Sequence, residues 1–426
     1  MSSRRGRLWY ISRGIPAHGL GGMERVVHEM ATGLARRGWS VSLITTRVDD
    51  APALPEKASG AASEGRSRPF HEGVPEGVEL HALDAKPGRF THAFSRALLR
   101  WGEAHRHDPP DLILTATLAA GPLVARLAHL PAVFQAHGSS WAEAAVKLRA
   151  ADGRGFYRLW LYLTSERAFL RRFERIIAVG PAVRSYFERG PYRFLDRSRI
   201  VTIPNGIDLQ ALDRAGFSRQ AEREALGVKE HQRLVLTAGL LIREKGALDL
   251  LRAYAAMEER RRIALAIAGE GRDAHLLSDL ARREGLDQVR LVGRVPRDRL
   301  LGLVRASDLV AQVGTRPEGL PLIVLEALCL GCPVLVSDAM PLPAFGGEEG
   351  VWRARAGDPR SIGEGLRRVL ESRAPMADVA ASARARFSLD RSLDEYEALF
   401  AEVIAAGRSG GAAHDRPRRA GRKEAP

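Results

Sequence analysis

The 426-residue chain contains only two cysteines, Cys329 and Cys332, and no long apolar run. Its longest apolar stretches, 112–118 and 320–330, fall well short of the roughly 20 residues that a membrane-spanning helix needs. Two cysteines cannot build a disulfide framework, and one C-x-x-C without a second ligand pair is weak evidence for zinc. The sequence therefore predicts no metal, a reducing cytoplasmic compartment, and two small core residues around a glycine turn.

Acidic residues are also too few to balance the basic ones: 65 Lys and Arg stand against 51 Asp and Glu, for a net charge of +14. Most of the excess lies in the N-terminal half, where it suits acidic substrates or peripheral contact with anionic lipid at the inner face of a membrane. Arginines spread over solvated faces explain the same charge, and this alternative stays open. No nucleic-acid partner is expected, because the sequence has no RNP, zinc or helix-turn-helix pattern.

Short apolar runs alternate with amphipathic segments along the chain. The run LWYIS at 8–12, a loop rich in Gly and Pro, a helical pattern over 23–37 and the run VSLIT at 41–45 predict a parallel strand–helix–strand unit. A second series of such units starts after Pro204-Asn205-Gly206. The fold class is therefore α/β, with two Rossmann-like domains.

The predicted domains are 1–204 and 205–387, followed by an amphipathic helix over 388–407 and a disordered basic tail over 408–426. The segment 49–77 is polar and rich in Gly, Pro and Ser, which indicates a surface insertion or mobile loop. In open parallel sheets, ligands bind at the carboxyl ends of the strands, against helix N-termini. Four loops occupy such places here.

Two of these loops offer glycine or positive charge. In HGLGGMERVV, Gly21 and Gly22 would let the backbone of a helix start approach an anion closely. In AGLLIREKG, Arg243 and Lys245 lie where a phosphate would meet the next helix. A structural glycine turn and a solvated pair of cations are the respective alternatives.

The other two loops offer acceptors of hydrogen bonds. In RPEGLPLIVLEALCLGCPV, Glu318 and Glu326 are eight positions apart, which places them near the same face of a helix. Ionised carboxylates accept from sugar or ribose hydroxyls, and the amides of Gly319 and Leu320 would be open to a diphosphate. His137, after the strand AVFQ, would hydrogen-bond a substrate hydroxyl or be a structural histidine.

These loops, in this order, resemble the retaining glycosyltransferases of family 4, whose fold is called GT-B. The most specific element is EGLPLIVLEALCLGCPVLVSD, which is similar to the family's motif of two glutamates separated by seven residues. GGMERVVHEM, AHG at 136–138, VTIPNGID and REKGALDLL add to the resemblance, which covers the chain from Leu8 to about Gly407. The family has an arginine where this chain has Leu240, and whether Arg243 replaces it stays open.

The resemblance implies two domains that face each other across a cleft, with a C-terminal helix that packs back on the N-terminal domain. It also implies that Glu326 binds the nucleotide ribose, that Glu318 and His137 line the sugar site, and that Lys245 neutralises the diphosphate. Gly21 and Gly22 would border the donor phosphates, and Gly319 and Leu320 would complete the donor site. His137, Glu318 and Lys245 are the predicted catalytic residues.

The predicted function is transfer of a hexosyl unit from a UDP- or GDP-sugar, with retention, to a glycan, a lipid-linked acceptor or a secondary metabolite. No cofactor is expected, since the sugar nucleotide is the donor substrate. Two alternatives stay open: a sugar-nucleotide epimerase of the same fold, and a non-catalytic or weakened sugar-nucleotide-binding protein. The sequences of the loops that select the donor sugar, the base and the acceptor do not indicate which of these the protein binds.

Overall fold

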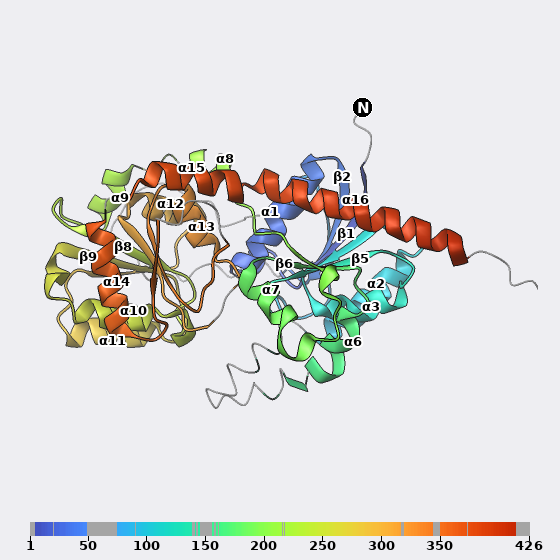
Figure 1. Ribbon diagram of the computed structural model, residues 1–426, viewed down its shortest axis with the longest axis horizontal. Coiled ribbons are helices and arrows are strands. Elements are labelled where there is room, and N and C mark those ends of the chain that lie inside the picture. Colours follow the sequence, from blue (N-terminus) through green and yellow to red (C-terminus); the bar gives the residue numbers. More distant parts are fainter. Residues whose placement is uncertain are drawn as a thin grey trace, which may run out of the picture.

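The structure is a computed structural model that describes residues 5–414, apart from internal gaps. The gaps are residues 20, 49–74, 90, 139–140, 142–143, 145–155, 157–158, 161, 215, 217, 317–318, 344–349 and 373. Glu318, most of the predicted insertion at 49–77 and the end of the predicted basic tail therefore lie outside the described residues. Figure 1 shows two α/β units side by side, each with a central sheet.

The first unit is a seven-stranded sheet in the order β3-β2-β1-β4-β5-β6-β7, and every strand pair is parallel. The strands are β1 (Gly6–Ile11), β2 (Trp39–Thr46), β3 (Glu79–Leu83), β4 (Leu112–Thr115), β5 (Ala132–Ala136), β6 (Arg175–Ala178) and β7 (Ile200–Thr202). Its helices include α1 (Gly22–Arg36), α2 (His92–Ala104), α3 (Gly121–Arg126), α6 (Arg167–Leu170) and α7 (Pro181–Glu188). The central strands β1, β4 and β5 are mostly apolar and buried because helices cover both faces of a parallel sheet.

The second unit is a six-stranded parallel sheet in the order β10-β9-β8-β11-β12-β13. Its strands are β8 (Arg233–Ala238), β9 (Ile263–Ala268), β10 (Val289–Gly293), β11 (Leu309–Gln312), β12 (Val334–Ser337) and β13 (Val351–Ala354). The helices are α8 (Leu209–Arg214), α9 (Arg219–Ala225), α10 (Ala247–Ala255), α11 (Ala274–Arg283), α12 (Arg297–Ala306), α13 (Leu322–Cys329), α14 (Pro359–Glu371) and α15 (Met376–Phe387). Two parallel-sheet α/β units are the predicted fold class.

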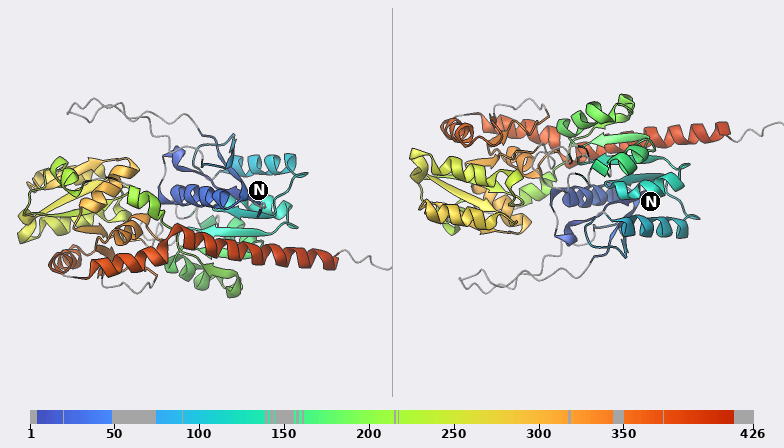
Figure 2. Two further views of the ribbon diagram at one scale, coloured as in Figure 1. Left: turned by 90° about the horizontal axis from the view of Figure 1, so that it is seen from above. Right: turned by 90° about the horizontal axis from the view of Figure 1, so that it is seen from below.

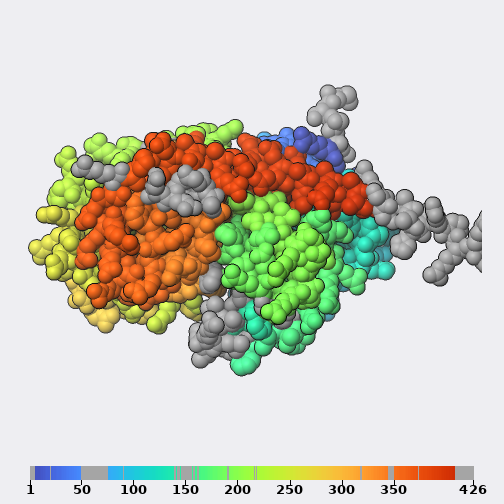
Figure 3. Space-filling model, viewed as in Figure 1, coloured from blue at the N-terminus to red at the C-terminus, as the bar shows by residue number. Residues whose placement is uncertain are grey.

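The last helix, α16 (Leu389–His414), follows α15 directly and lies along the first unit, as Figures 1 and 2 show. In the space-filling view, α15 and α16 form one continuous band across both units (Figure 3). The turn between them is held by Ile207, whose N–H donates to the Phe387 carbonyl at 2.7 Å and whose carbonyl accepts from Leu389 at 2.8 Å. The helix extends beyond the predicted end at 407, so the predicted tail begins inside it.

α16 docks on the first unit through a charged edge and a buried core. Arg37, at the end of α1, binds the carboxylates of Asp390, Asp394 and Glu397. Inside, the Gln135 amide donates to the Tyr396 hydroxyl at 2.7 Å and accepts from the Tyr10 hydroxyl at 2.6 Å. The C-terminal helix thus packs back on the N-terminal sheet.

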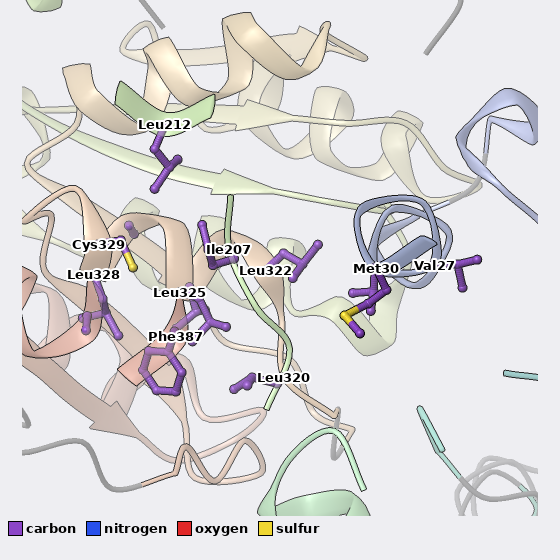
Figure 4. Close-up of a cluster of buried hydrophobic side chains, with 14 of the residues drawn as sticks. Val27, Met30, Ile207, Leu212, Leu320, Leu322, Leu325, Leu328, Cys329 and Phe387 are labelled. Atoms are coloured by element: carbon purple, nitrogen blue, oxygen red, sulfur yellow. The ribbon is translucent and has the colours of Figure 1, made fainter. Parts of the chain in front are cut away.

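One buried apolar cluster joins the two units. In Figure 4, Val27 and Met30 extend from α1, and they belong to the same cluster as Leu322, Leu325 and Phe387 of the second unit. Cys329 and Cys332 are buried in this cluster with free thiols, and burial raises the pKa of each to about 12.

No group of His, Cys, Asp and Glu among the described residues could hold a metal ion. None of the described helices is long and apolar enough to cross a membrane.

Candidate active site

The site forms where the carboxyl ends of the two sheets meet. The Arg294 side chain, just after β10, donates to the carbonyl of Gly19 in the loop after β1 at 3.3 Å. The Asn205 side chain donates to the carbonyl of Leu320 at 3.3 Å. Parallel strands bring their carboxyl ends to one edge, and all four predicted loops leave from such strand ends.

The glycine loop places the start of α1 against the second unit. Gly21 and Gly22 are exposed, and a Cβ atom on Gly22 would lie 3.7 Å from the Leu322 side chain of α13. A Cβ atom on Gly21 would meet nothing within 4 Å. The α1 N-terminus therefore has room for a ligand beside Gly21, and its first amides point to the junction.

The loop after β8 is held by close contact with the loop after β11. Gly246 has φ +79°, and a Cβ atom there would lie 2.2 Å from the Val313 carbonyl oxygen, so only glycine fits. The backbone N–H of Thr315 donates to the Glu244 carbonyl at 3.0 Å. Lys245 is half-buried directly before α10, where a phosphate would also meet the helix dipole.

Arg243 and Leu240 lie in the same loop but are exposed. The backbone N–H of Arg243 donates to the Asp273 carboxylate at 2.6 Å, which fixes the loop while the guanidinium stays in solvent. Leu240 is 53% exposed, an unusual position for a leucine. Its side chain therefore faces solvent at the position where the resemblance implies an arginine.

Glu326 lies in the second turn of α13 and is enclosed, with 1% of its side chain exposed. One carboxylate oxygen, Oε1, forms an ion pair with Arg297, the first residue of α12. The other oxygen, Oε2, is buried without a hydrogen-bond partner among the described residues. Because an unpaired buried oxygen is costly, Oε2 is a strong candidate to accept a hydrogen bond from a ligand.

The loop before α13 touches the first unit. Gly319 packs against Val183 and the carbonyl of His137, where a Cβ atom would lie 3.3 and 3.5 Å away. Leu320 is 5% exposed, so its side chain belongs to the buried cluster and only its backbone is available to a phosphate. The structure therefore brings Gly319 and His137 together, while Glu318 lies outside the described residues.

His137 follows β5, and its Nε2 is enclosed without a hydrogen-bond partner among the described residues. Burial, helped by the nearby positive charge of Arg13, lowers the pKa of His137 to about 4. The imidazole is therefore neutral near pH 7, and it can hydrogen-bond a sugar hydroxyl but carries no charge.

Three site residues carry no signal in the sequence. Arg13 approaches both His137 and the buried Glu24, with Nη2 4.0 Å from the Glu24 carboxylate. Arg297 pairs with Glu326, and the charges of both act on Glu29 of the first unit. The three residues come from separate segments of the chain, and only the folded structure brings each of them near its partners.

The arrangement of two parallel sheets with facing carboxyl ends defines the GT-B class of glycosyltransferases. Sucrose-phosphate synthase from Thermosynechococcus elongatus superposes with a TM-score of 0.74 at 19% identity, over 94% of this chain and 100% of that one. The Anabaena protein HepE, solved in complex with UDP and glucose, superposes with a TM-score of 0.68 at 18% identity and the same coverage.

Sequence comparison supplies the family. Residues 20–211 match the model of glycosyltransferase family 4, and residues 218–386 match that of the glycosyl transferases group 1. The D-inositol 3-phosphate glycosyltransferase of Mycolicibacterium smegmatis is 30% identical over 95% of this chain and 91% of its own length. The glycogen synthase of Mycobacterium tuberculosis is 27% identical over 95% of both chains. The chain belongs to glycosyltransferase family 4.

Proposed function

We propose that this glycosyltransferase moves a hexosyl unit from a UDP- or GDP-sugar to an acceptor hydroxyl with retention of anomeric configuration. The observation that carries the proposal is the enclosed Oε2 of Glu326, an acceptor that has no partner among the described residues. Ribose hydroxyls are donors of the right kind for it. The UDP seen in the Anabaena neighbour supports a nucleoside diphosphate of this type.

The bond from the anomeric carbon to the diphosphate breaks in this reaction, and the acceptor oxygen bonds to that carbon as its proton leaves. Negative charge grows on the diphosphate. Lys245, the N-terminus of α10 and the exposed Arg243 would stabilise that charge from the second unit. The N-terminus of α1, with Gly21 and Gly22, would face it from the first unit.

The sugar would lie between the two units, near His137 and Gly319, with Glu318 assigned to the same place by the family motif. His137 offers an uncharged nitrogen, which suits a hydroxyl and adds no positive charge beside an electron-poor sugar ring. Gly319 lies against the His137 carbonyl, so closure of the two units around a bound sugar would exclude water and favour transfer over hydrolysis.

The ribose contact is tested by calorimetric titration of UDP, GDP and their 2′-deoxy and 3′-deoxy forms. Wild type should bind one nucleoside diphosphate more tightly than its deoxy forms by about tenfold, the value of one hydrogen bond to a charged group. Glu326→Gln should lose most of that difference. If Glu326→Gln discriminates like wild type, Glu326 does not bind the ribose.

Turnover separates the open alternatives. Sugar transfer or donor hydrolysis by the purified protein excludes a non-catalytic binding protein, and an epimerised donor on thin-layer chromatography would indicate an epimerase. Proton NMR of the glycoside measures the anomeric configuration, and an inverted product would contradict retention.

A lipid-linked acceptor has one structural observation in its favour. Trp141, Phe156, Trp160 and Leu163 are exposed large apolar side chains of the basic N-terminal half, and four of seven such residues in the described structure lie within 141–163. Exposed apolar side chains in a half of the chain with net positive charge suit peripheral contact with an anionic membrane. Co-sedimentation with phosphatidylglycerol vesicles should fall in Trp160→Ala, whereas unchanged binding would favour a glycan or small soluble acceptor.

A further inference from the structure

Two enclosed ion pairs, one from each unit, lie on helices near the junction of the sheets. Arg25 and Glu29 come from α1 of the first unit, with Nη1 and Oε1 3.1 Å apart. Arg297 begins α12 and Glu326 lies on α13, both in the second unit. All four side chains are at most 19% exposed. Charges this well enclosed interact more strongly than surface pairs do.

Arg297 pairs with only one of the two carboxylate oxygens of Glu326. Its guanidinium binds Oε1, and Oε2 stays enclosed without a partner among the described residues. A plain structural ion pair would be completed by further hydrogen bonds, because desolvation of two charges is otherwise poorly repaid. The half-satisfied carboxylate is better explained as an acceptor that Arg297 holds in one orientation.

Glu29 extends this arrangement to the other unit. Burial raises the pKa of Glu29 to about 7, the charge of Glu326 adds to that rise, and the charges of Arg25 and Arg297 oppose it. Arg25 lies on the same helix as Glu29, while Arg297 and Glu326 belong to α12 and α13 of the other unit. The charges of the Arg297–Glu326 pair therefore act on Glu29 of the opposing unit.

We propose that Arg297 is a positioning residue of the donor site: it holds Oε1 of Glu326 so that Oε2 faces the nucleotide. The inference rests on the proposed function, because it assigns the ribose to Oε2. Arginine suits the task because its planar guanidinium can hold two acceptors in fixed directions, whereas the ammonium of lysine is a single flexible charge.

The test uses the full chain and titrates UDP and GDP into four variants: Arg297→Gln, Arg297→Lys, Glu326→Gln and Arg299→Gln. Arg299 is the matched control, since it lies on the same helix but approaches Glu222 of its own unit at 4.0 Å. Melting temperatures and circular dichroism identify any variant that fails to fold. Steady-state rates then separate KM for the donor from kcat.

Arg297→Gln should weaken nucleotide binding about tenfold or more and raise KM for the donor, because one charged hydrogen bond that orients the ligand's acceptor is lost. Arg297→Lys should recover part of the affinity, and Arg299→Gln should bind like wild type. Wild-type affinity in a folded Arg297→Gln, with binding lost in Glu326→Gln, would overturn the role of Arg297 alone. Unchanged binding in both would overturn the proposed ribose site as well.

Electrostatic coupling of the pair to Glu29 on α1 is tested by adding Glu29→Gln. This change should alter nucleotide affinity in the wild-type background, and its effect should shrink at least threefold in the Arg297→Gln background, since coupled residues are not additive. Equal effects in both backgrounds would show that Glu29 acts independently of Arg297 and would remove the link between the units.

Discussion

At the scale of single residues, burial sets the protonation states around the site. Glu29 and His137 lie on the first unit near the junction, and desolvation moves both away from the charged form. A carboxyl group keeps its proton to higher pH when buried, whereas an imidazole gives its proton up at higher acidity. The two groups should therefore affect stability and activity in opposite pH ranges.

Glu29→Gln should stabilise the protein at alkaline pH. The folded protein keeps the Glu29 proton up to about pH 7, whereas the unfolded chain loses it near 4.5, so stability falls as pH rises between these values. The amide cannot ionise and avoids this loss. The gain in the free energy of unfolding should be near zero at pH 4.5 and up to about 3 kcal/mol at pH 8.

Urea unfolding at pH 4.5 and pH 8 measures the difference, with Glu364→Gln as an exposed control. A gain of the same size at both pH values would show that ionisation of Glu29 is not its cause.

His137→Ala should lower kcat about a hundredfold, the effect of losing one oriented polar group at a reacting centre. Because the pKa of His137 is about 4, its protonation should add no step to the wild-type kcat profile between pH 5.5 and 8. Steady-state assays over this range measure both effects, and the exposed His129→Ala provides the control. Unchanged kcat in His137→Ala would exclude His137 from the sugar site.

At the scale of secondary-structure elements, the N-termini of two helices supply positive potential to the site. α10 begins directly after Gly246 and α1 begins at Gly22, so both dipoles point to the junction. Lys245 adds a full charge to the first of these helix starts, at the place where the tight contact of Gly246 with Val313 fixes the loop.

Lys245→Ala should remove the thermal stabilisation given by nucleoside diphosphate and lower kcat by two to three orders of magnitude, about 3 kcal/mol. Scanning calorimetry with and without UDP or GDP measures the first effect, and Lys229→Ala, an exposed lysine before β8, controls for loss of charge. An equal shift in the melting temperature of Lys245→Ala and wild type would remove Lys245 from the site.

At the scale of the whole molecule, α16 ties the end of the chain to the first sheet. Gln135 lies on β5 and joins the buried hydroxyls of Tyr10 and Tyr396, so one amide bridges the sheet and the last helix. Loss of such a bridge leaves two buried hydroxyl groups without partners, which costs more than the hydrogen bonds themselves contribute.

Gln135→Met should therefore lower the free energy of unfolding by about 2 to 4 kcal/mol. Gln210→Met, at an exposed position of α8, controls for the change of side chain. Denaturant titration of both variants measures the difference. A Gln135→Met protein as stable as its control would mean that apolar packing alone holds α16.

The sequence predicted most of the fold because buried parallel strands are short apolar runs. The predicted run at 8–12 overlaps β1, and the one at 41–45 lies within β2. It missed β3 and β13, whose side chains are partly exposed and lack a continuous apolar run. Edge strands are difficult to predict from sequence, because each is hydrogen-bonded to a neighbour along one edge only and its side chains are less buried.

The local sequence by itself determined the two α/β units, the glycine turns and the place of Glu326 on a helix. Each of these depends on residues that are close together in the chain. Only the tertiary structure decided that Arg297 would hold one oxygen of Glu326 and that the charges of both would act on Glu29 of the other unit. These residues come from three helices in two units, and no spacing along the chain encodes their meeting. The physical reason is that burial and charge pairing depend on how the two sheets face each other, which local sequence patterns do not specify.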